Sequence, residues 1–256
     1  MDRIDINCDM GESFGRYQLG QDAALIERIT SASIACGFHA GDPLVMSQTV
    51  QLARQHGVAI GAHPAYPDLQ GFGRRTMEMT AEEIEAFTLY QVAALAGIAK
   101  ACGMELAHVK AHGALYNYAA QHREAALAIA RAVAGFSKGL ILVGLAGSFF
   151  ESAASETGLK YASEGFPERG YNPDGTLMSR RLPGAVIDSP EEAARQALRL
   201  AREGIRVTRG EQQDTYRVDT LCIHGDSPNA PAVSQAIQAA LLAEGITPTS
   251  LQMLLG

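Results

Sequence analysis

Several short stretches of the chain have apolar residues at every second position, with polar or small residues between them. In IDINCD (residues 4–9), every second residue is apolar, and the residues between them are Asp5, Asn7 and Asp9. The same alternation recurs in IACGFH (34–39), VAIGAH (58–63), HVKAH (108–112) and LCIHGD (221–226). Because successive side chains of a strand point to opposite faces, the pattern predicts strands with one apolar and one polar face.

Helical stretches lie between these predicted strands. Several end on a glycine that precedes an extended run, at Gly57, Gly103, Gly158 and Gly204. A glycine there adopts the left-handed conformation that ends a helix without a Cβ clash. Two pairs have capping-box spacing and predict helix starts, Thr80 with Glu83 and Ser189 with Glu192. The run IRVTR (205–209) follows Gly204, and we expect it to be a further strand of the series.

Strands that alternate with helices over a whole chain indicate parallel βα units. An open, doubly wound sheet is covered by helices on both faces, so its strands should be apolar on both faces. The polar face found here instead favours a closed barrel, with polar residues inside and apolar residues toward the helices. No linker or low-complexity segment interrupts the chain. We therefore predict an α/β fold, a parallel (β/α) barrel formed by residues 1–256 as a single domain.

Composition excludes several classes of partner. The net charge is −7 without a basic block, which argues against nucleic acid. The longest apolar run, GLILVGLAGSFF, is too short for a bilayer, which takes about 20 residues. The start of the chain has no apolar signal region, and the four cysteines form no C-x-x-C pair. We expect a cytoplasmic protein that binds a small molecule and neither nucleic acid nor membrane.

Candidate chemistry gathers at the C-terminal ends of the predicted strands, where barrel enzymes keep their active sites. Asp9, His39 and His63 end three successive strands, and these residue types can bind a divalent metal. A metal-free acid/base network is the alternative for the same three residues.

The stretch HVKAH has Val109 on one face and three basic residues on the other. It is no H-E-x-x-H motif, because Val109 stands in the place of the glutamate. Lys110 and His112 are predicted to point into the barrel mouth, as candidates for charge stabilisation and proton transfer. His108 should lie deeper and be structural.

Further candidates come from other strands and from loops. Glu164 is a candidate general base, and His224 and Asp226 are catalytic candidates from the last strand. Asn7, Arg74 and Arg169 are candidate substrate-binding residues, although the two arginines could also be solvated surface residues. GESFG (11–15) matches the G-x-S-x-G motif but follows the first strand without a helix behind it, which disfavours Ser13 as a nucleophile. The chain has no Walker-type phosphate loop.

Six blocks of the sequence resemble the LamB/YcsF family. They are INCDMGESFG, ACGFHAGDP, GAHPAYPDLQGFGRR, VKAHGALYN, EGFPERGYNPDGTL and CIHGDSP, and the resemblance runs from Asp5 to about Pro228. The family block usually reads V-K-P-H-G, and Ala111 replaces the proline here. Residue 111 should face outward by its parity, so we expect little consequence for function.

The resemblance implies a seven-stranded barrel of the glycoside hydrolase/deacetylase type. It also implies the A subunit of an ATP-dependent 5-oxoprolinase, which opens 5-oxo-L-proline to L-glutamate together with subunits B and C. Related deacetylase barrels hold a metal with one aspartate and two histidines, as Asp9, His39 and His63 could. We hypothesise that the partner subunits use ATP to phosphorylate the lactam oxygen and that this chain opens the activated ring. Two alternatives remain, a stand-alone metal-dependent deacetylase or amidohydrolase and a non-catalytic, substrate-carrying subunit.

Overall fold

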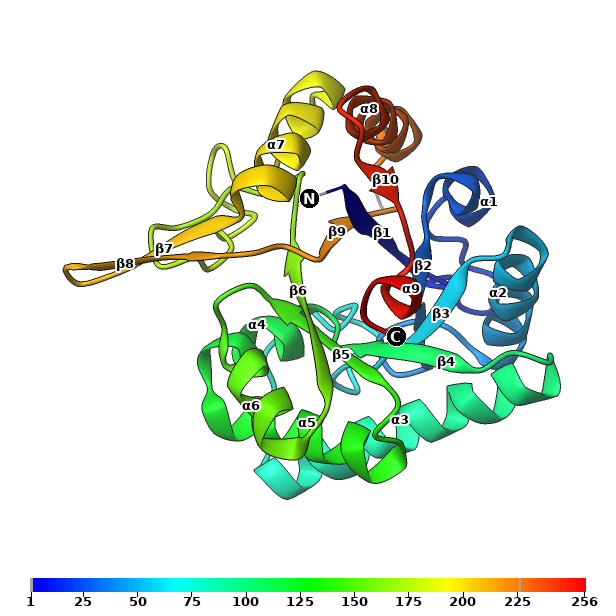
Figure 1. Ribbon diagram of the computed structural model, residues 1–256. Coiled ribbons are helices and arrows are strands. Elements are labelled where there is room, and N and C mark those ends of the chain that lie inside the picture. The colour runs from blue at the N-terminus through cyan, green and yellow to red at the C-terminus, as the bar shows by residue number, and fades with distance from the viewer. Residues whose placement is uncertain (1, 226) are drawn as a thin grey trace.

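Seven parallel strands close into a barrel in the computed structural model, which describes residues 2–225 and 227–256 (Figure 1). The strands are β1 (Arg3–Met10), β2 (Ser31–Ala35), β3 (Ala59–His63), β4 (Leu106–Lys110), β5 (Ile141–Leu145), β6 (Lys160–Gly165) and β9 (Thr220–Ile223). They follow one another in this order around the barrel, and β9 pairs with both β6 and β1 to close it. The predicted seven-stranded (β/α) barrel is confirmed.

Helices surround the barrel and connect its strands (Figure 1). They are α1 (Asp22–Leu25) with the 3₁₀ turn η1 (Ile26–Arg28), α2 (Pro43–His56), α3 (Ala81–Ala101), α4 (Gly113–Gln121), α5 (Arg123–Phe136), α6 (Phe149–Thr157), α7 (Pro190–Glu203), α8 (Ala230–Ala243) and α9 (Leu251–Leu255). Among the described residues, no helix is both long and apolar enough to cross a membrane.

Local sequence explains where the longer helices begin and end. Asp42 caps α2, because its carboxylate accepts hydrogen bonds from the backbone of Leu44 and Val45, and Pro43 follows at the first helical position. Gly57 ends the same helix at φ 67°, a left-handed conformation that glycine adopts without strain. Thr80 and Glu83 form the predicted capping box of α3.

The two faces of the barrel strands border two different apolar clusters. Outward residues of the strands, such as Ile4, Ile60 and Val109, pack with the surrounding helices in the main apolar cluster. Inside the barrel, Ile141 and Val143 of β5 pack against Leu251 of the C-terminal helix α9. The short strand β10 (Thr247–Pro248) leads into that helix and pairs with β1. The interior is therefore apolar around α9, while polar side chains fill the rest.

Two predicted strands differ in the structure. The strand predicted at 34–39 lies earlier, at Ser31–Ala35, because Gly37 has φ +93° and turns the chain away; His39 therefore comes from a loop. The run 205–209 is β7 (Ile205–Arg209), but it pairs antiparallel with β8 (Gln212–Tyr216) in a hairpin that projects from the barrel (Figure 1). On one face of β7, Arg206 is exposed and Thr208 is half-buried, whereas barrel strands are covered on both faces.

His108 lies inside the barrel, as its parity predicts. It is buried, and its Nε2 lies 3.1 Å from the Ser33 hydroxyl. Burial lowers the pKa of His108 to about 3, with Lys110 and His63 adding to the effect, so the ring is neutral. A Cβ on Gly61 would overlap the His108 ring, so the glycine of β3 makes room for it. These contacts agree with the structural role predicted for His108.

Candidate active site

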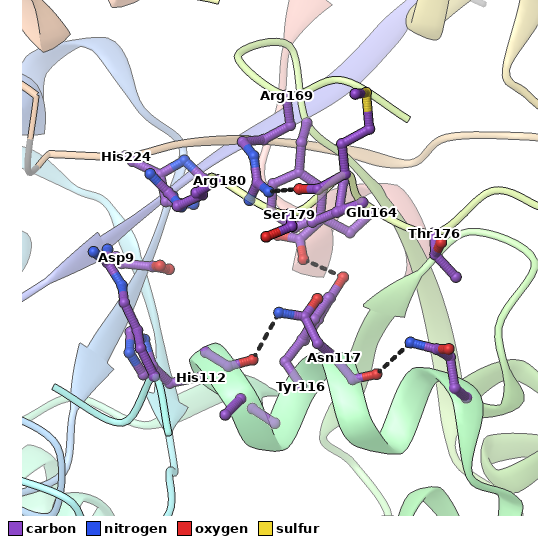
Figure 2. Close-up of a pocket in the computed structure, with 18 of the residues that line it drawn as sticks. Asp9, His112, Tyr116, Asn117, Glu164, Arg169, Thr176, Ser179, Arg180 and His224 are labelled. Carbon is purple, nitrogen blue, oxygen red and sulfur yellow. Dashed lines mark hydrogen bonds between the residues drawn. The ribbon is translucent and has the colours of Figure 1, made fainter. Parts of the chain in front are cut away.

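A pocket of about 760 Å³ opens at the C-terminal ends of the barrel strands (Figure 2). Its inner wall is formed by side chains from strand ends and the start of α4, namely Asp9, His63, Lys110, His112, Tyr116, Glu164 and His224. Its outer wall is formed by loop residues that include Arg74, Arg169, Arg180 and Arg181. The pocket thus has a mixed-charge interior and a rim rich in arginine.

The Lys110 ammonium lies on the inner wall of the pocket, next to Asp9. Its Nζ is 2.6 Å from Asp9 Oδ1 and 3.1 Å from Glu164 Oε1. It also donates to Asn7 Oδ1 at 2.7 Å and to Cys222 Sγ at 3.3 Å. Residues of three other strands therefore direct polar atoms at one cation.

The two charges of the central ion pair stabilise each other. Burial alone would lower the pKa of Lys110, but Asp9, Cys222 and Glu164 together raise it well above its ordinary value. Burial alone would raise the pKa of Asp9, but His63 and Lys110 hold it well below the usual range. Lys110 is therefore cationic and Asp9 anionic at neutral pH.

Glu164, the predicted general base, has both carboxylate oxygens occupied. Oε1 accepts from Lys110 and, at 2.9 Å, from the Asn7 amide, while Oε2 accepts from the Tyr116 hydroxyl at 2.7 Å. These contacts suit Glu164 for holding Lys110 and Tyr116 in place. Asn7 also donates to Thr220 Oγ1 at 2.7 Å, so it belongs to the support of Lys110.

Two buried imidazoles face each other beside Asp9. His63 Nδ1 lies 2.8 Å from the Lys110 carbonyl, and His112 Nε2 lies 2.9 Å from the Phe72 carbonyl. A carbonyl oxygen only accepts, so these two nitrogens carry the hydrogens. The remaining nitrogens, His63 Nε2 and His112 Nδ1, lie 3.0 Å apart. If both rings are neutral, two lone pairs point at each other, and a proton or a cation is needed between them.

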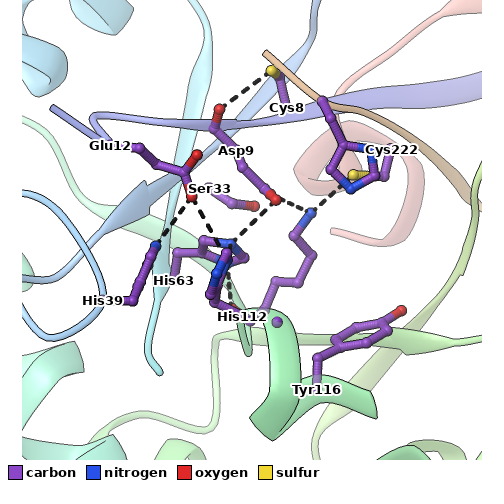
Figure 3. A network of polar contacts seen from close by, with 12 residues as sticks. Cys8, Asp9, Glu12, Ser33, His39, His63, His112, Tyr116 and Cys222 are labelled. Carbon is purple, nitrogen blue, oxygen red and sulfur yellow. Dashed lines mark hydrogen bonds and ion pairs between the residues drawn. The ribbon is translucent and has the colours of Figure 1, made fainter. Parts of the chain in front are cut away.

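Glu12 and His39 complete this cluster (Figure 3). Glu12 Oε1 is 3.6 Å from His112 Nδ1 and 3.1 Å from His39 Nε2. The rings of His39 and His112 stack with centroids 3.7 Å apart. Burial is the main cause that lowers the pKa of both histidines well below the ordinary value, and the neighbouring histidines contribute. Both rings are therefore neutral, the form that binds metal ions.

The cluster has the dimensions of a metal site. In a tetrahedral site with bonds of about 2.0–2.1 Å, neighbouring ligand atoms lie about 3.3–3.4 Å apart. Three neighbouring pairs are close to this value: His63 Nε2 to His112 Nδ1 at 3.0 Å, His63 Nε2 to Asp9 Oδ2 at 3.3 Å, and His112 Nδ1 to Glu12 Oε1 at 3.6 Å. The outer nitrogens of His63 and His112 also bond to carbonyls, as metal-bound imidazoles usually do.

His224 lines the pocket just beyond the end of β9. Its Nδ1 lies 3.3 Å from Glu168 Oε2, and its backbone N–H donates to the same oxygen at 2.8 Å. Glu168 is buried, in the loop that follows β6. The carboxylate holds His224 at both the backbone and the ring.

The two predicted arginines differ in their surroundings. Arg169 is buried, and its guanidinium donates to the carbonyls of Ala185 and Met178, which ties down the loop at the pocket rim. Burial, with a contribution from Arg180, lowers its pKa to about 10. Arg74 lies with its guanidinium carbon 5.0 Å from the centre of the Phe72 ring and lines the pocket.

Most of the predicted site residues meet at one mouth. Asp9, His63, Lys110, His112, Glu164, His224, Arg74 and Arg169 all line the pocket, while Asn7 and His39 lie directly behind lining residues. Asp226 lies outside the described residues. Ala111 is buried in the apolar core and also borders the pocket, so it does not simply face outward. Ser13 bonds through its hydroxyl to the Leu19 backbone and does not line the pocket.

Sequence reasoning missed Glu12, Tyr116 and Glu168. Each stands within a few residues of a predicted site residue, in the blocks INCDMGESFG, VKAHGALYN and EGFPERGYNPDGTL. All three lie outside the barrel strands, two in loops and one in α4, so the parity of the strands could not reveal them. Their place in the blocks that carry the family resemblance was the one available signal.

Comparison with known proteins places the chain in a family. The family model described as "LamB/YcsF family" matches residues 4–255. A protein of Pyrococcus horikoshii, named as the A subunit of 5-oxoprolinase, is 51% identical over 245 residues, which cover 95% of this chain and 96% of the relative. A protein of the same name from Methylococcus capsulatus is 53% identical over 243 residues, 95% of this chain and 94% of the relative.

A solved structure agrees with these relatives. The crystal structure of a lactam utilization protein from Thermus thermophilus is 47% identical, with a TM-score of 0.89, and the match covers 97% of this chain and 100% of that one. The residues matched by the family model include every described residue of the pocket. The chain therefore belongs to the LamB/YcsF family.

Proposed function

We propose that this chain opens the lactam ring of 5-oxo-L-proline to L-glutamate, as the A subunit of an ATP-dependent 5-oxoprolinase. The observation that carries the proposal is the buried Lys110 ammonium, held by Asp9, Glu164 and Asn7 at the wall of a pocket. A fixed cation in a dry site stabilises negative charge on a reacting oxygen. The names of the 5-oxoprolinase relatives and of the lactam utilization protein supply the substrate class.

The lactam needs activation before water can open it, because an unstrained five-membered amide is a poor electrophile. The sequence has no Walker-type loop with which this chain could bind ATP. We therefore assign phosphorylation of the lactam oxygen to partner subunits B and C, with ATP as co-substrate of the complex. The relatives are named as one subunit of a larger enzyme, which supports a complex of several chains. The complex is proposed to work in the cytoplasm.

The pocket divides the work between its two walls. Lys110 faces the developing charge on the lactam oxygen or its phosphate. The arginine rim, with Arg74 as its first candidate, binds the substrate carboxylate or the phosphate. Asp9 keeps Lys110 charged and in position rather than taking a proton itself, because a carboxylate with a strongly lowered pKa is a weak base.

The function is tested by ATP-dependent release of glutamate from 5-oxo-L-proline, with this chain alone and with subunits B and C. We expect no useful turnover from the chain alone and ATP-dependent turnover from the complete set. Turnover with ATP by the single chain would overturn the division of labour. A complete, folded set that releases no glutamate would overturn the function itself.

We also propose a divalent cation bound by His63, His112 and Glu12, with Asp9 next to it. This set modifies the predicted set of Asp9, His39 and His63, because His39 Nε2 is directed at Glu12 and can orient that carboxylate. A bound cation would supply Lewis-acid charge to a substrate oxygen. The facing nitrogens of His63 and His112 support this proposal.

Metal binding can be measured without any activity. In a competition titration with a chromogenic chelator, the metal-free chain is expected to bind one equivalent of Zn²⁺. His39→Asn, which loosens Glu12, should weaken binding about 10–100-fold, and His112→Asn should weaken it further. His122→Asn is the matched control, since His122 is exposed and stacks on Tyr118 away from the cluster. If the folded wild-type chain binds no Zn²⁺, or if His112→Asn binds Zn²⁺ as well as wild type does, a shared proton rather than a metal ion lies between the two rings.

A second candidate is a stand-alone metal-dependent deacetylase or amidohydrolase, which the histidine cluster favours. It predicts hydrolysis of N-acyl substrates by the metal-loaded chain without ATP or partners. The third possibility, a non-catalytic carrier, predicts that substitutions at Lys110 leave the turnover of the complex unchanged.

A further inference from the structure

Opening a phosphorylated lactam poses a problem of selectivity. When water adds to the ring carbon, that carbon carries a hydroxyl, the phosphate oxygen and the ring nitrogen. Phosphate leaves readily without help, and its departure regenerates the lactam, so that ATP is consumed without product. The carbon–nitrogen bond breaks only if the nitrogen takes up a proton as it leaves. The enzyme therefore needs a proton carrier directed at the ring nitrogen.

Most titratable groups of the inner wall are already engaged. Lys110 is held by two carboxylates, and both oxygens of Glu164 accept hydrogen bonds. His63 and His112 each use one ring nitrogen on a backbone carbonyl and direct the other at each other. His224 has a different arrangement, because its hydrogen bonds to other described residues involve its backbone N–H and Nδ1 but not Nε2.

The position of Glu168 determines which nitrogen of the His224 ring carries the hydrogen. A carboxylate oxygen accepts hydrogen bonds, so His224 Nδ1 carries the hydrogen that points at Glu168 Oε2, 3.3 Å away. In the neutral ring, Nε2 then has a free lone pair. The ring also lies nearly parallel to Phe166, with centroids 5.8 Å apart, which restricts its rotation. His224 is thus oriented by a buried carboxylate, as the histidine of a Ser-His-Asp triad is.

His224 also lies at the right place in the pocket. Its side chain is 16% exposed, while that of Glu168 is 7% exposed, so the ring forms the accessible end of the pair. A ring nitrogen of His224, a carboxylate oxygen of Asp9 and the Cys222 sulfur all lie within 4.8 Å of one another. The ring therefore stands beside the Asp9–Lys110 pair that faces the substrate oxygen.

We infer that His224 carries the proton that commits the water adduct to carbon–nitrogen cleavage, and that Glu168 is its positioning residue. This inference rests on the proposed function. Nε2 takes a proton from the hydroxyl of the adduct and delivers it to the ring nitrogen. The carbon–nitrogen bond breaks, the hydroxyl oxygen becomes a carbonyl, and the product is an acyl phosphate with a free amine. A second water then converts the acyl phosphate to the carboxylate of glutamate and inorganic phosphate.

The inference predicts that the loss of Glu168 uncouples phosphate release from glutamate release. In the reconstituted complex, wild type should release about one phosphate per glutamate. Glu168→Gln should lower glutamate release about 10²–10⁴-fold, the range of general acid–base help, while phosphate release falls much less. The phosphate-to-glutamate ratio should therefore rise at least about tenfold. A merely structural role would lower both products together and leave the ratio unchanged, and that result would overturn the inference.

Further variants distinguish the loss of the His224–Glu168 pair from misfolding. His224→Asn keeps the backbone N–H on Glu168 and removes the proton carrier, so it should uncouple to the same extent. The double variant should be no worse than either single one, because the two residues act as a unit. Glu156→Gln is the matched control, since Glu156 is an exposed partner of Arg123 that does not line the pocket, and its ratio should stay at the wild-type value.

Nitrogen NMR of histidine-labelled chain tests the geometry without partners or substrate. The resonances of His224, assigned by their loss in His224→Asn, should show the Nδ1–H form in wild type and a shift toward the Nε2–H form in Glu168→Gln. An unchanged ring form in Glu168→Gln would overturn the positioning role of Glu168. A wild-type complex that releases no glutamate would refute the proposed function, while this spectrum would still decide the role of Glu168.

Discussion

Replacing Lys110 with methionine is expected to lower glutamate release by the complete enzyme about 10²–10³-fold. Methionine keeps most of the volume of the side chain and removes only its charge. The ammonium lies 2.6 Å from Asp9 and 3.1 Å from Glu164, so it is held in one position before substrate arrives. A cation fixed in this way needs no rearrangement as negative charge develops on the lactam oxygen. The measurement is steady-state turnover in the reconstituted complex.

The same substitution also affects stability, which calls for a matched variant. Without Lys110, the carboxylates of Asp9 and Glu164 lose their shared buried cation, a change that typically costs about 3–5 kcal/mol of unfolding free energy. Adding Glu164→Gln removes one of the two charges and should restore much of that stability. We expect the double variant to fold well and to remain inactive. Near-normal turnover by folded Lys110→Met would show that the ammonium takes no part in the reaction and would favour the non-catalytic carrier.

Asp5 should make the protein less stable as the pH rises. It is fully buried inside the barrel, where its carboxylate accepts hydrogen bonds from Thr30, Ser31 and Thr220. Burial raises its pKa from 3.8 to about 6, although these hydroxyls partly oppose the rise. The folded state therefore favours the protonated acid. The resulting stability is fully present below pH 3.8, the unfolded value, and is lost as the pH rises through about 6.

The expected size of this effect is about 3 kcal/mol, because the pKa rises from 3.8 to about 6 on folding and each tenfold change in proton affinity corresponds to about 1.4 kcal/mol. Urea unfolding of wild type and Asp5→Asn between about pH 4 and pH 7 measures it. The difference in unfolding free energy between wild type and Asp5→Asn should fall by about 3 kcal/mol as the pH rises from about 4 to about 7. A difference that does not change with pH would mean that Asp5 titrates alike in the folded and unfolded chain.

The sequence alone was sufficient to assign which side chains face into the barrel and which face the surrounding helices. Alternation along a strand is a local property, so the inward positions of Asp9, Lys110 and Glu164 could be assigned without knowing which strands are neighbours. In a parallel barrel, all strands end at the same mouth, so these residues had to converge. The distinction between His108 below and Lys110 above also follows from position along one strand, and the structure confirms it.

Elements that depend on loops could not be assigned in this way. The positive φ of Gly37 takes His39 out of its predicted strand, and the antiparallel pairing of β7 with β8 removes IRVTR from the barrel. Gly37 lies within the alternating stretch and β8 lies outside it, but in neither case does alternation reveal the course of the chain. Periodicity reports the exposure of a strand but not the strand with which it pairs.

By itself, the sequence determined the fold class, the family resemblance and most of the residues at the mouth, because these depend on local periodicity and on short motifs. Only the tertiary structure decided what each of those residues can do. Both carboxylate oxygens of Glu164 accept hydrogen bonds, from Lys110, Asn7 and Tyr116. The backbone carbonyls of Lys110 and Phe72 determine which ring nitrogens of His63 and His112 carry hydrogens. Glu168 orients His224 from a loop 56 residues away in the chain. Protonation and hydrogen-bond roles depend on burial and on partners distant in sequence, and these exist only once the barrel has closed.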